Sequence, residues 1–488
     1  MQKAVTIRSA AVCALVLAAA GLRLPLLGAR PMHADEAILA DKLGTLLSTG
    51  AFPYDPLDYH GPVLAYLAWV PAHLTGRTTY AALTEAVLRA APAAAGILLA
   101  LSPLLLAPAI GWTAAFAAAA LAAVSPALVY YSRDYIPEVP LALWTALLLA
   151  ALMRPGIGWR ALAGVAAGLM IATKETAVLA LASAAIAYAA ATRLRRPDWR
   201  GVAAFLIAWA AAVSILLPPP WKWGMLAHAA GAYLERGVGG GLHLHPWYAY
   251  FQWLAGWRYR FTEGPILVLA AAGLAAAWRN KSPALRFLAL YAVSLAVLYS
   301  ALHYKTPWCA VSLLYALALL AGAGVAALAG RWRTGTILAA TAVAAALAWQ
   351  AWMAAVPYAA DPRNPWAYAQ TGTGVFAIRD RVEEFAGVAP EGRNIAIDIY
   401  TRENLWPLPW YFRTYPNVRW WRQVIVPGRA APIVLVSPAM EQDLARKLYE
   451  GPPPGERELY MNLFPAYVEL RPWVEVRGYV VKSLWDRR

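Results

Sequence analysis

The sequence carries little charge for its length. Of its 488 residues only 14% are Asp, Glu, Lys or Arg, whereas 61% are hydrophobic. Soluble domains carry about 25% charged residues, so this scarcity excludes an ordinary soluble globular protein. A multi-pass α-helical membrane protein has such a composition.

Cysteine is also scarce, with Cys13 and Cys309 alone in the chain, both in or beside apolar runs. Two isolated cysteines provide neither a disulfide framework nor a metal-ligand spacing, so they do not indicate a redox compartment. In the polar C-terminal part, no glycine-rich phosphate loop precedes a predicted helix, and a nucleotide-binding domain is therefore not expected there.

The net charge of +15 is the one strong charge signal, but it does not indicate nucleic-acid binding. The basic residues lie mainly in short loops between apolar runs, which is the pattern of cytoplasmic membrane loops. The strongest such loop lies at 193–200, and Lys3 and Arg8 fall on the same side. We therefore predict a cell-membrane protein with a cytoplasmic amino terminus and a carboxyl terminus outside.

Apolar runs long enough to cross a bilayer recur along the first 356 residues and predict about eleven spans. They lie at 8–28, 86–107, 112–131, 139–153, 159–173, 176–192, 201–218, 264–278, 286–302, 308–330 and 334–356. The first run could also be a signal peptide, but the many later spans favour a retained anchor.

One further apolar segment, Pro62–Gly76, is short, contains Pro71 and His73, and would reverse the loop parity if it crossed. We predict a helix lying flat at the interface within an outer loop over 29–85.

With this topology, the polar islands between the spans emerge on the non-cytoplasmic face. They are His33–Glu36, Arg133–Glu138, Lys174–Glu175, a long outer loop over 219–262, and His303–Lys305. Scattered structural polar residues have no reason to choose one face. This clustering is the strongest functional signal in the sequence.

Asp35 and Glu36 form the first island, at the mouth of a membrane segment, where charges are costly. Abstraction of a proton from a hydroxyl group needs a carboxylate held close to it with little competing water. We predict both as catalytic residues, with Asp35 as the base. The structural alternative is that Asp35 caps the helix that follows it.

The second island contains Arg133, Asp134 and Glu138. We predict Asp134 as a further catalytic residue and Glu138 on the acceptor side. With Asp35, these two carboxylates are the candidates for a divalent cation, Mg²⁺ or Mn²⁺, although no cofactor is certain. An ordinary salt-bridged turn is the structural alternative.

Lys174 and Lys305 supply cations on the same face, and His303 lies beside the second of them. Such groups bind phosphate as point charges or hydrogen-bond donors. Snorkelling at the interface is the alternative for both lysines.

The outer loop at 219–262 contains a glycine run, Gly239–Gly241, followed by His243 and His245. The glycines are typical of a lid or a substrate-facing loop. Two histidines two residues apart suit a metal site, but no companion ligands lie nearby.

After residue 357 the charge rises and no spanning run follows. Segments 393–400, 431–436 and 458–463 predict strands, and 440–450 predicts a helix. We therefore divide the chain into a membrane domain over 1–356 and a soluble extracytoplasmic α/β domain over 357–488.

The order of these motifs resembles the GT-C superfamily of membrane glycosyltransferases, which includes protein O-mannosyltransferases and lipid A aminoarabinose transferases. The resemblance extends over nearly the whole chain. It is carried by His33–Ala37, Tyr59–Pro62, Lys174–Thr176, Gly239–His243, Lys305–Trp308 and Leu405–Tyr411. These motifs are most similar to a prokaryotic subgroup labelled as flippase-activity-associated.

The resemblance implies transfer of a sugar from a polyprenyl-phosphate donor to a hydroxyl of a glycan, lipid or protein acceptor, on the outer face and with inversion. It implies Asp35 as general base, and Lys174 and Lys305 as ligands of the donor phosphate, helped by His303 or Arg133. We predict His60, Glu138, His243 and His245 on the acceptor and loop side. The rival is a transporter or flippase for lipid-linked sugars, but polar groups at one face and the lack of an internal repeat favour the enzyme.

Overall fold

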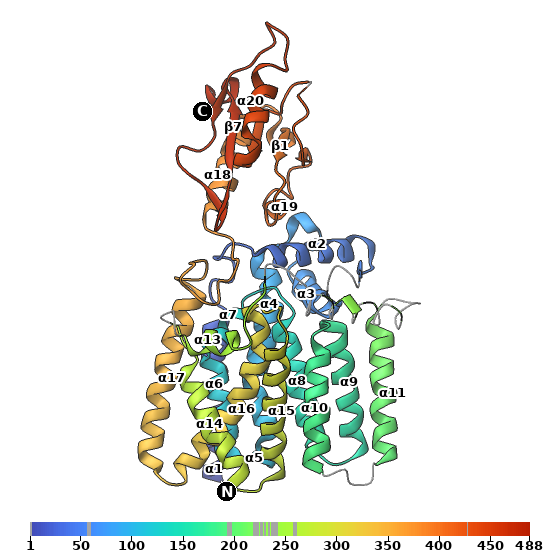
Figure 1. Ribbon diagram of the computed structural model, residues 1–488, viewed down its shortest axis with the longest axis vertical. Coiled ribbons are helices and arrows are strands. Elements are labelled where there is room, and N and C mark those ends of the chain that lie inside the picture. Colours follow the sequence, from blue (N-terminus) through green and yellow to red (C-terminus); the bar gives the residue numbers. More distant parts are fainter. Residues whose placement is uncertain are drawn as a thin grey trace.

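The protein is a helical bundle with a small mixed α/β region at one end, as seen in a computed structural model (Figure 1). The structure describes residues 2–55, 60–192, 198–217, 243–256, 261–426 and 428–488, with single positions between 224 and 235. The amino terminus lies at the end of the bundle opposite the α/β region (Figure 1). We call the end that carries the α/β region the sheet-side end.

In the first part of the chain, the elements that the structure describes are helices. They are α1 (Gln2–Arg23), α2 (Ala34–Thr49), α3 (Val63–Leu74), η1 (Tyr80–Ala82), α4 (Glu85–Leu101), η2 (Ser102–Leu106), α5 (Ala107–Ile110), α6 (Trp112–Val124), α7 (Pro126–Tyr131), α8 (Glu138–Leu152), α9 (Ile157–Thr173), α10 (Ala177–Thr192), α11 (Trp199–Leu216), α13 (Ala249–Ala255), α14 (Gly264–Arg279), α15 (Pro283–Ala301), η3 (Pro307–Cys309), α16 (Ala310–Ala329) and α17 (Arg333–Ala355).

Every apolar run predicted to span coincides with one of these helices, or with two in succession. Among the described residues, five helical segments are long and apolar enough to cross a membrane by themselves. They are Glu85–Ile110, Trp199–Leu216, Pro283–Ala301, Pro307–Ala329 and Arg333–Ala355, and several shorter apolar helices run beside them. The predicted fold class, a polytopic helical membrane protein with a C-terminal α/β region, is confirmed.

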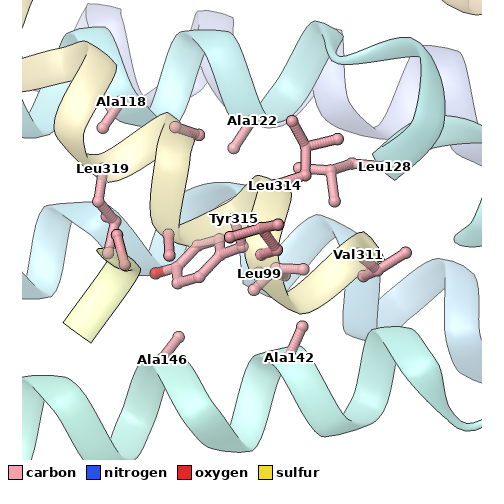
Figure 2. Packing of buried hydrophobic residues seen from close by; sticks show 14 of the residues in the cluster. Leu99, Ala118, Ala122, Leu128, Ala142, Ala146, Val311, Leu314, Tyr315 and Leu319 are labelled. Carbon is pink, nitrogen blue, oxygen red and sulfur yellow. The ribbon is translucent and has the colours of Figure 1, made fainter. Parts of the chain in front are cut away.

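Helix α16 lies at the centre of the bundle because small residues allow its neighbours to approach closely. Val311, Leu314 and Tyr315 of α16 lie between alanines of α6 and α8 (Figure 2). A Cβ atom on Gly322 would collide with the backbone of α6, so only glycine fits there. The buried Tyr315 hydroxyl is satisfied by Ser102 Oγ at 2.7 Å.

Helices α2 and α3 lie at the sheet-side end of the bundle, between it and the α/β region (Figure 1). Their buried residues belong to the same hydrophobic cluster as the sheet, which continues one core from α2 into the C-terminal region. Polar contacts add to this junction: Trp410 Nε1 donates to Glu85 at 2.8 Å, and Arg413 Nη2 donates to the Leu83 carbonyl at 2.6 Å.

The C-terminal region contains a five-stranded sheet of order β2-β1-β3-β7-β4, in which β1 pairs in parallel with β2 and β3. The central strands β1 and β3 are fully buried. Burial explains the continuous apolar run of β3, whereas β1 contains Asp398, which is paired with Arg419 at 2.7 Å. The elements are α18 (Gly374–Val388), η4 (Gly392–Asn394), β1 (Ile397–Tyr400), α19 (Leu408–Tyr411), β2 (Val418–Trp421), β3 (Ile433–Val436), η5 (Pro438–Met440), α20 (Glu441–Tyr449), β4 (Tyr460–Asn462), β5 (Glu469–Arg471), β6 (Val474–Glu475), β7 (Arg477–Val481) and α21 (Lys482–Trp485).

Three strands and one helix of this region were predicted from sequence, whereas α18 and β7 were not. Helix α18 mixes charged and apolar residues, and β7 begins at an arginine and contains Gly478. Both elements depend on packing against the sheet, because their local patterns are weak.

Candidate functional site

A cavity of about 190 Å³ opens at the sheet-side end of the bundle, beside α2. Its wall combines residues from five separate segments of the chain. They are Asp35, Leu39, His60, Lys174, Glu175, Thr176, Tyr250, Tyr299, Leu302, Tyr304, Thr306, Trp308 and Cys309. Three polar islands predicted from sequence, around positions 35, 174 and 304, therefore meet at one place.

Asp35 presents a carboxylate that the fold leaves available. His33, not Asp35, is the N-cap of α2: its Nδ1 accepts the Asp35 backbone N–H at 3.1 Å. The Asp35 side chain is 48% exposed, and its nearest charged partner is His33 Nδ1 at 3.9 Å, too far for a hydrogen bond. The capping alternative is thus wrong for Asp35, and its carboxylate stays free to accept a proton.

Glu36 has the opposite environment. It is fully buried, and its oxygens accept hydrogen bonds from Arg89 Nε at 2.8 Å, Arg89 Nη2 at 2.7 Å and the backbone N–H groups of His33 and Tyr135. Burial by itself would raise the pKa of Glu36, but Arg89 outweighs it, and the pKa falls to about 2. This geometry argues against the predicted catalytic role of Glu36 and for a structural one.

Lys174 follows the last turn of α9 in extended conformation, and its ammonium reaches both the cavity and Glu138. Both side chains are nearly buried, at 6% and 5% exposure. Burial lowers the pKa of Lys174, but the Glu138 carboxylate more than reverses this effect and raises it, so the ammonium stays charged. Glu138 therefore acts on Lys174, and it does not line the cavity as an acceptor residue would.

His60 and Glu175 form a second pair on the cavity wall, with Nδ1 and Oε2 2.7 Å apart. The contact depends on Gly61, since a Cβ atom there would collide with the Ala172 carbonyl at the end of α9. Burial raises the pKa of Glu175, but His60 outweighs it and the pKa falls to about 2. His60 thus lies at the site, as predicted, and Glu175 is a wall residue that we did not single out.

Lys305 and His303 do not reach this cavity. The Lys305 ammonium is buried against backbone carbonyls at the end of α15, including Ser300 at 3.2 Å and Leu302. His303 is exposed. The prediction that these two residues contact the donor phosphate in this cavity is therefore not supported. The Lys305 ammonium caps the end of α15, and His303 lies outside the cavity.

Arg133 and Asp134 lie elsewhere as well. Arg133 donates to the carbonyls of Leu22, Arg23 and Leu26 beyond the end of α1, while Asp134 pairs with Arg30. Neither residue lines the cavity beside Asp35. Their predicted roles in phosphate binding and catalysis are not supported by this geometry.

His243 and His245 converge on a tyrosine from the segment that leads to the C-terminal region. Their ring nitrogens lie 2.9 and 3.3 Å from the Tyr368 hydroxyl. Burial lowers the pKa of His243 more than Asp35 raises it. Tyr368 could not be found from sequence, because it belongs to a distant linker. The glycine run Gly239–Gly241 lies outside the described residues.

Aromatic rings surround this group and extend to the cavity. Trp308 makes edge-to-face contacts with His33, at 5.6 Å between ring centroids, and with Tyr368 at 5.9 Å. His243 packs edge-on against Tyr304 at 5.3 Å. Flat amphipathic rings of this kind suit the packing of a saccharide.

The three carboxylates proposed for a divalent cation do not meet. Asp134 is bound to Arg30 and Glu138 to Lys174, so their charges are already balanced. Over the described ranges, no three His, Cys, Asp or Glu side chains come close enough to hold a metal ion. The residues therefore do not fit a shared cation, and His243 and His245 do not fit zinc.

Comparison with known proteins finds one family that is similar to part of the chain. The family model described as dolichyl-phosphate-mannose-protein mannosyltransferase matches residues 59–223, about a third of the chain. No curated protein sequence matches significantly.

Solved structures match over nearly the whole chain. ArnT from Cupriavidus metallidurans bound to undecaprenyl phosphate matches with a TM-score of 0.66 and 15% identity, over 96% of this chain and 97% of that one. The apo form gives a TM-score of 0.61 at 16% identity over 98% of both chains. The archaeal oligosaccharyltransferase AglB from Archaeoglobus fulgidus, with an inhibitory peptide and a dolichol-phosphate, matches at 0.59 and 13% identity, over 90% and 70%.

The family match and the fold similarity agree. The chain is similar to the mannosyltransferase family over residues 59–223, and its fold is similar to that of ArnT and AglB. The prediction of a glycosyltransferase agrees with the family match over residues 59–223.

Proposed function

We propose that this protein is a glycosyltransferase that transfers a sugar from a polyprenyl-phosphate donor to an acceptor hydroxyl, with inversion and with Asp35 as general base. The observation that carries the proposal is that an acidic and a basic side chain line the same cavity. A free carboxylate, Asp35, and a charged ammonium, Lys174, line the same space. A base for the acceptor and a cation for the leaving phosphate are the two groups that the reaction needs.

The donor phosphate is assigned to Lys174 rather than Lys305. Its ammonium can donate further hydrogen bonds beside its contact with Glu138. The solved relatives support a lipid phosphate as ligand class, since one is bound to undecaprenyl phosphate and another to a dolichol-phosphate. Glu138 keeps Lys174 charged and positioned, so that the ammonium meets the phosphate in a fixed place.

An apolar groove beside the cavity suits the lipid tail of such a donor. It measures about 660 Å³ and lies against α14, α15 and α16, with Trp247 and Phe251 among its lining residues. Ser300 and Ala301 line the groove, while the neighbouring Tyr299 and Leu302 line the Asp35 cavity. A polyprenyl chain in the groove would thus bring its phosphate to the site.

In the proposed step, the Asp35 carboxylate takes the proton of the acceptor hydroxyl as its oxygen attacks the anomeric carbon. The bond from that carbon to the phosphate oxygen breaks, and the lipid phosphate leaves with the electron pair. Lys174 stabilises the charge that develops on this phosphate. Phosphate is a good leaving group, so a strong general acid is less necessary than in glycoside hydrolysis.

We place the site on the outer face, with the amino terminus in the cytoplasm and residues 357–488 as an extracytoplasmic domain. The support is charge distribution: the basic loops around Arg154, Arg279 and Arg331 lie at the bundle end that carries the amino terminus (Figure 1). The sequence likeness to the flippase-associated subgroup agrees with this orientation and adds no separate activity.

The test is a transfer assay with purified protein in nanodiscs and radiolabelled polyprenyl-phosphate sugars. Total membrane lipids, glycans and proteins serve as acceptor pools. We expect label to pass from the donor to one pool, and Asp35→Asn to stop it. Transfer by the Asn variant at the wild-type rate would contradict the assignment of the base. Absence of transfer from any polyprenyl-phosphate sugar would contradict the donor class.

A further inference from the structure

A second polar cavity lies at the sheet-side end, beside the ends of α1 and α17. It measures about 350 Å³, and its wall includes Arg30, Arg133 and the segment that leaves α17. It shares no lining residue with the Asp35 cavity. The reaction proposed above does not use it, so its charged wall needs another explanation.

Arg30 has unused hydrogen-bonding capacity in this cavity. Its side chain is 5% exposed, and Nη2 donates to Asp134 and, at 2.7 Å, to the Arg133 carbonyl. Its guanidinium lies over the Tyr130 ring at 4.6 Å, but Nε and Nη1 are buried without a hydrogen-bond partner among the described residues. Burial of unpaired guanidinium donors is costly, because the lost hydration is not replaced. An acceptor that enters the cavity would remove this cost.

The buried charges around Arg30 are not balanced among themselves, and Asp361 on the cavity wall is already paired with the exposed Arg363. Four buried arginines form a connected group here, Arg23, Arg30, Arg89 and Arg133, and two buried carboxylates face them, Glu36 and Asp134. Two positive charges are therefore left without a buried partner. Burial and the nearby Arg30 and Arg89 lower the pKa of Arg133 to about 10, which reflects this excess. The missing component is an anion.

The surroundings of the cavity indicate that this anion comes from a lipid. Leu24 and Leu26, beyond the end of α1, are 47% and 57% exposed, and Trp349 is exposed in the last third of α17. Such surfaces on membrane helices face acyl chains. Leu26 also holds a positive φ of 56°, a conformation rare for leucine, in which its carbonyl accepts a hydrogen bond from Arg133. The arginine pair and these exposed apolar side chains thus lie at the same end of α1.

We infer that this cavity binds the phosphate of an anionic membrane lipid, held by Arg30 and Arg133, with the acyl chains along α1 and α17. Two donors of Arg30 and the remaining edge of Arg133 match the oxygens of one phosphate. The bound lipid balances the buried arginine group and stabilises the junction between the bundle and the segment leading to the sheet.

The experiment uses delipidated full-length protein in zwitterionic detergent, titrated with phosphatidylglycerol or phosphatidylcholine and observed by native mass spectrometry. We expect phosphatidylglycerol to bind about tenfold more tightly than phosphatidylcholine. Arg30→Gln and Arg133→Gln should each weaken phosphatidylglycerol binding about tenfold or more, because each loses a charged hydrogen bond. Arg393→Gln is the control: it is an exposed arginine paired with Glu383, neither residue lines the cavity, and the variant should bind as wild type.

Ala360→Asp keeps the proposal testable if the arginine variants do not fold. Ala360 lines the cavity, and an aspartate there would supply the missing anion from within. We expect this variant to exclude phosphatidylglycerol and to be more heat-stable than wild type without lipid. Wild-type lipid binding in this variant, or in both arginine variants, would overturn the site. Equal stabilisation by inorganic phosphate alone would overturn the lipid as its ligand.

Discussion

The carboxylates of Asp35 and Glu36 are adjacent in the chain but belong to different parts of the molecule. Glu36 accepts two hydrogen bonds from the Arg89 side chain and is fully buried, whereas Asp35 lines the cavity with 48% of its side chain exposed. The first turn of α2 thus carries a residue that holds the fold next to a residue that can react. Substitutions at the two positions should therefore fail in different ways.

Asp35→Asn should lower the transfer rate about 10²- to 10⁴-fold, because the variant keeps the shape of the side chain but cannot accept the proton. Its melting temperature should match wild type, since the carboxylate makes no hydrogen bond to a described residue. Single-turnover transfer and thermal unfolding of the same sample measure both. A variant that loses activity and stability together would assign Asp35 a structural role instead.

Glu36→Gln should destabilise the protein by several kcal/mol, because it leaves Arg89 buried without its counter-charge. The pKa of Glu36 is lowered from 4.5 to about 2 on folding, so the stabilisation is present above about pH 4.5 and is lost as pH falls towards 2. This shift corresponds to on the order of 3 kcal/mol. The stability difference between wild type and variant should therefore shrink over that pH range. A constant difference would contradict the assignment.

Lys174→Gln should raise the KM for the donor about tenfold or more, through loss of a charged contact to phosphate. It also leaves Glu138 buried and unpaired, which destabilises the fold. The double variant Lys174→Gln/Glu138→Gln restores a neutral pair, so it should regain stability but not the KM.

Lys305→Gln is the control for that experiment. Its ammonium caps the carbonyls of α15, so the variant should be less stable but should keep the wild-type KM. A rise in KM for Lys305→Gln with no change for Lys174→Gln would reverse the two assignments. Steady-state kinetics with varied donor, corrected for folded protein, measure the difference.

Gly61→Ala should reduce activity, because the added methyl group collides with the Ala172 carbonyl and displaces His60 from Glu175. Gly158→Ala is the matched control, since a Cβ there meets nothing within 4 Å. We expect at least a tenfold loss of transfer for the first and none for the second. Equal activity in the two variants would show that the His60–Glu175 contact is dispensable.

The orientation can be tested with single cysteines in a background that lacks Cys13 and Cys309. Ser48 in α2 and Lys281 between α14 and α15 are both exposed and lie at opposite ends of the bundle. In intact cells, an impermeant maleimide should label Ser48→Cys, whereas Lys281→Cys should react only after lysis. Labelling of Lys281→Cys in intact cells would invert the proposed topology.

The sequence by itself determined the membrane architecture and the end of the bundle at which the polar groups gather. Hydrophobic run length fixes where a helix can cross, and loop parity then assigns each polar island to a face. The same parity predicted that α3 does not cross the membrane. The islands around Asp35 and Lys174 could thus be predicted to meet, because neither inference needs side-chain geometry.

Only the tertiary structure decided which charged groups are free. Glu36 is neutralised by Arg89 and Asp134 by Arg30, while Lys305 is bound by its own helix end. Charged side chains that looked equally important in the sequence therefore differ in function. Whether each is paired in the low-dielectric interior depends on partners far along the chain. Arg89 looked like an ordinary residue at the start of a span. The free carboxylate of Asp35 is what remains after these pairs are made.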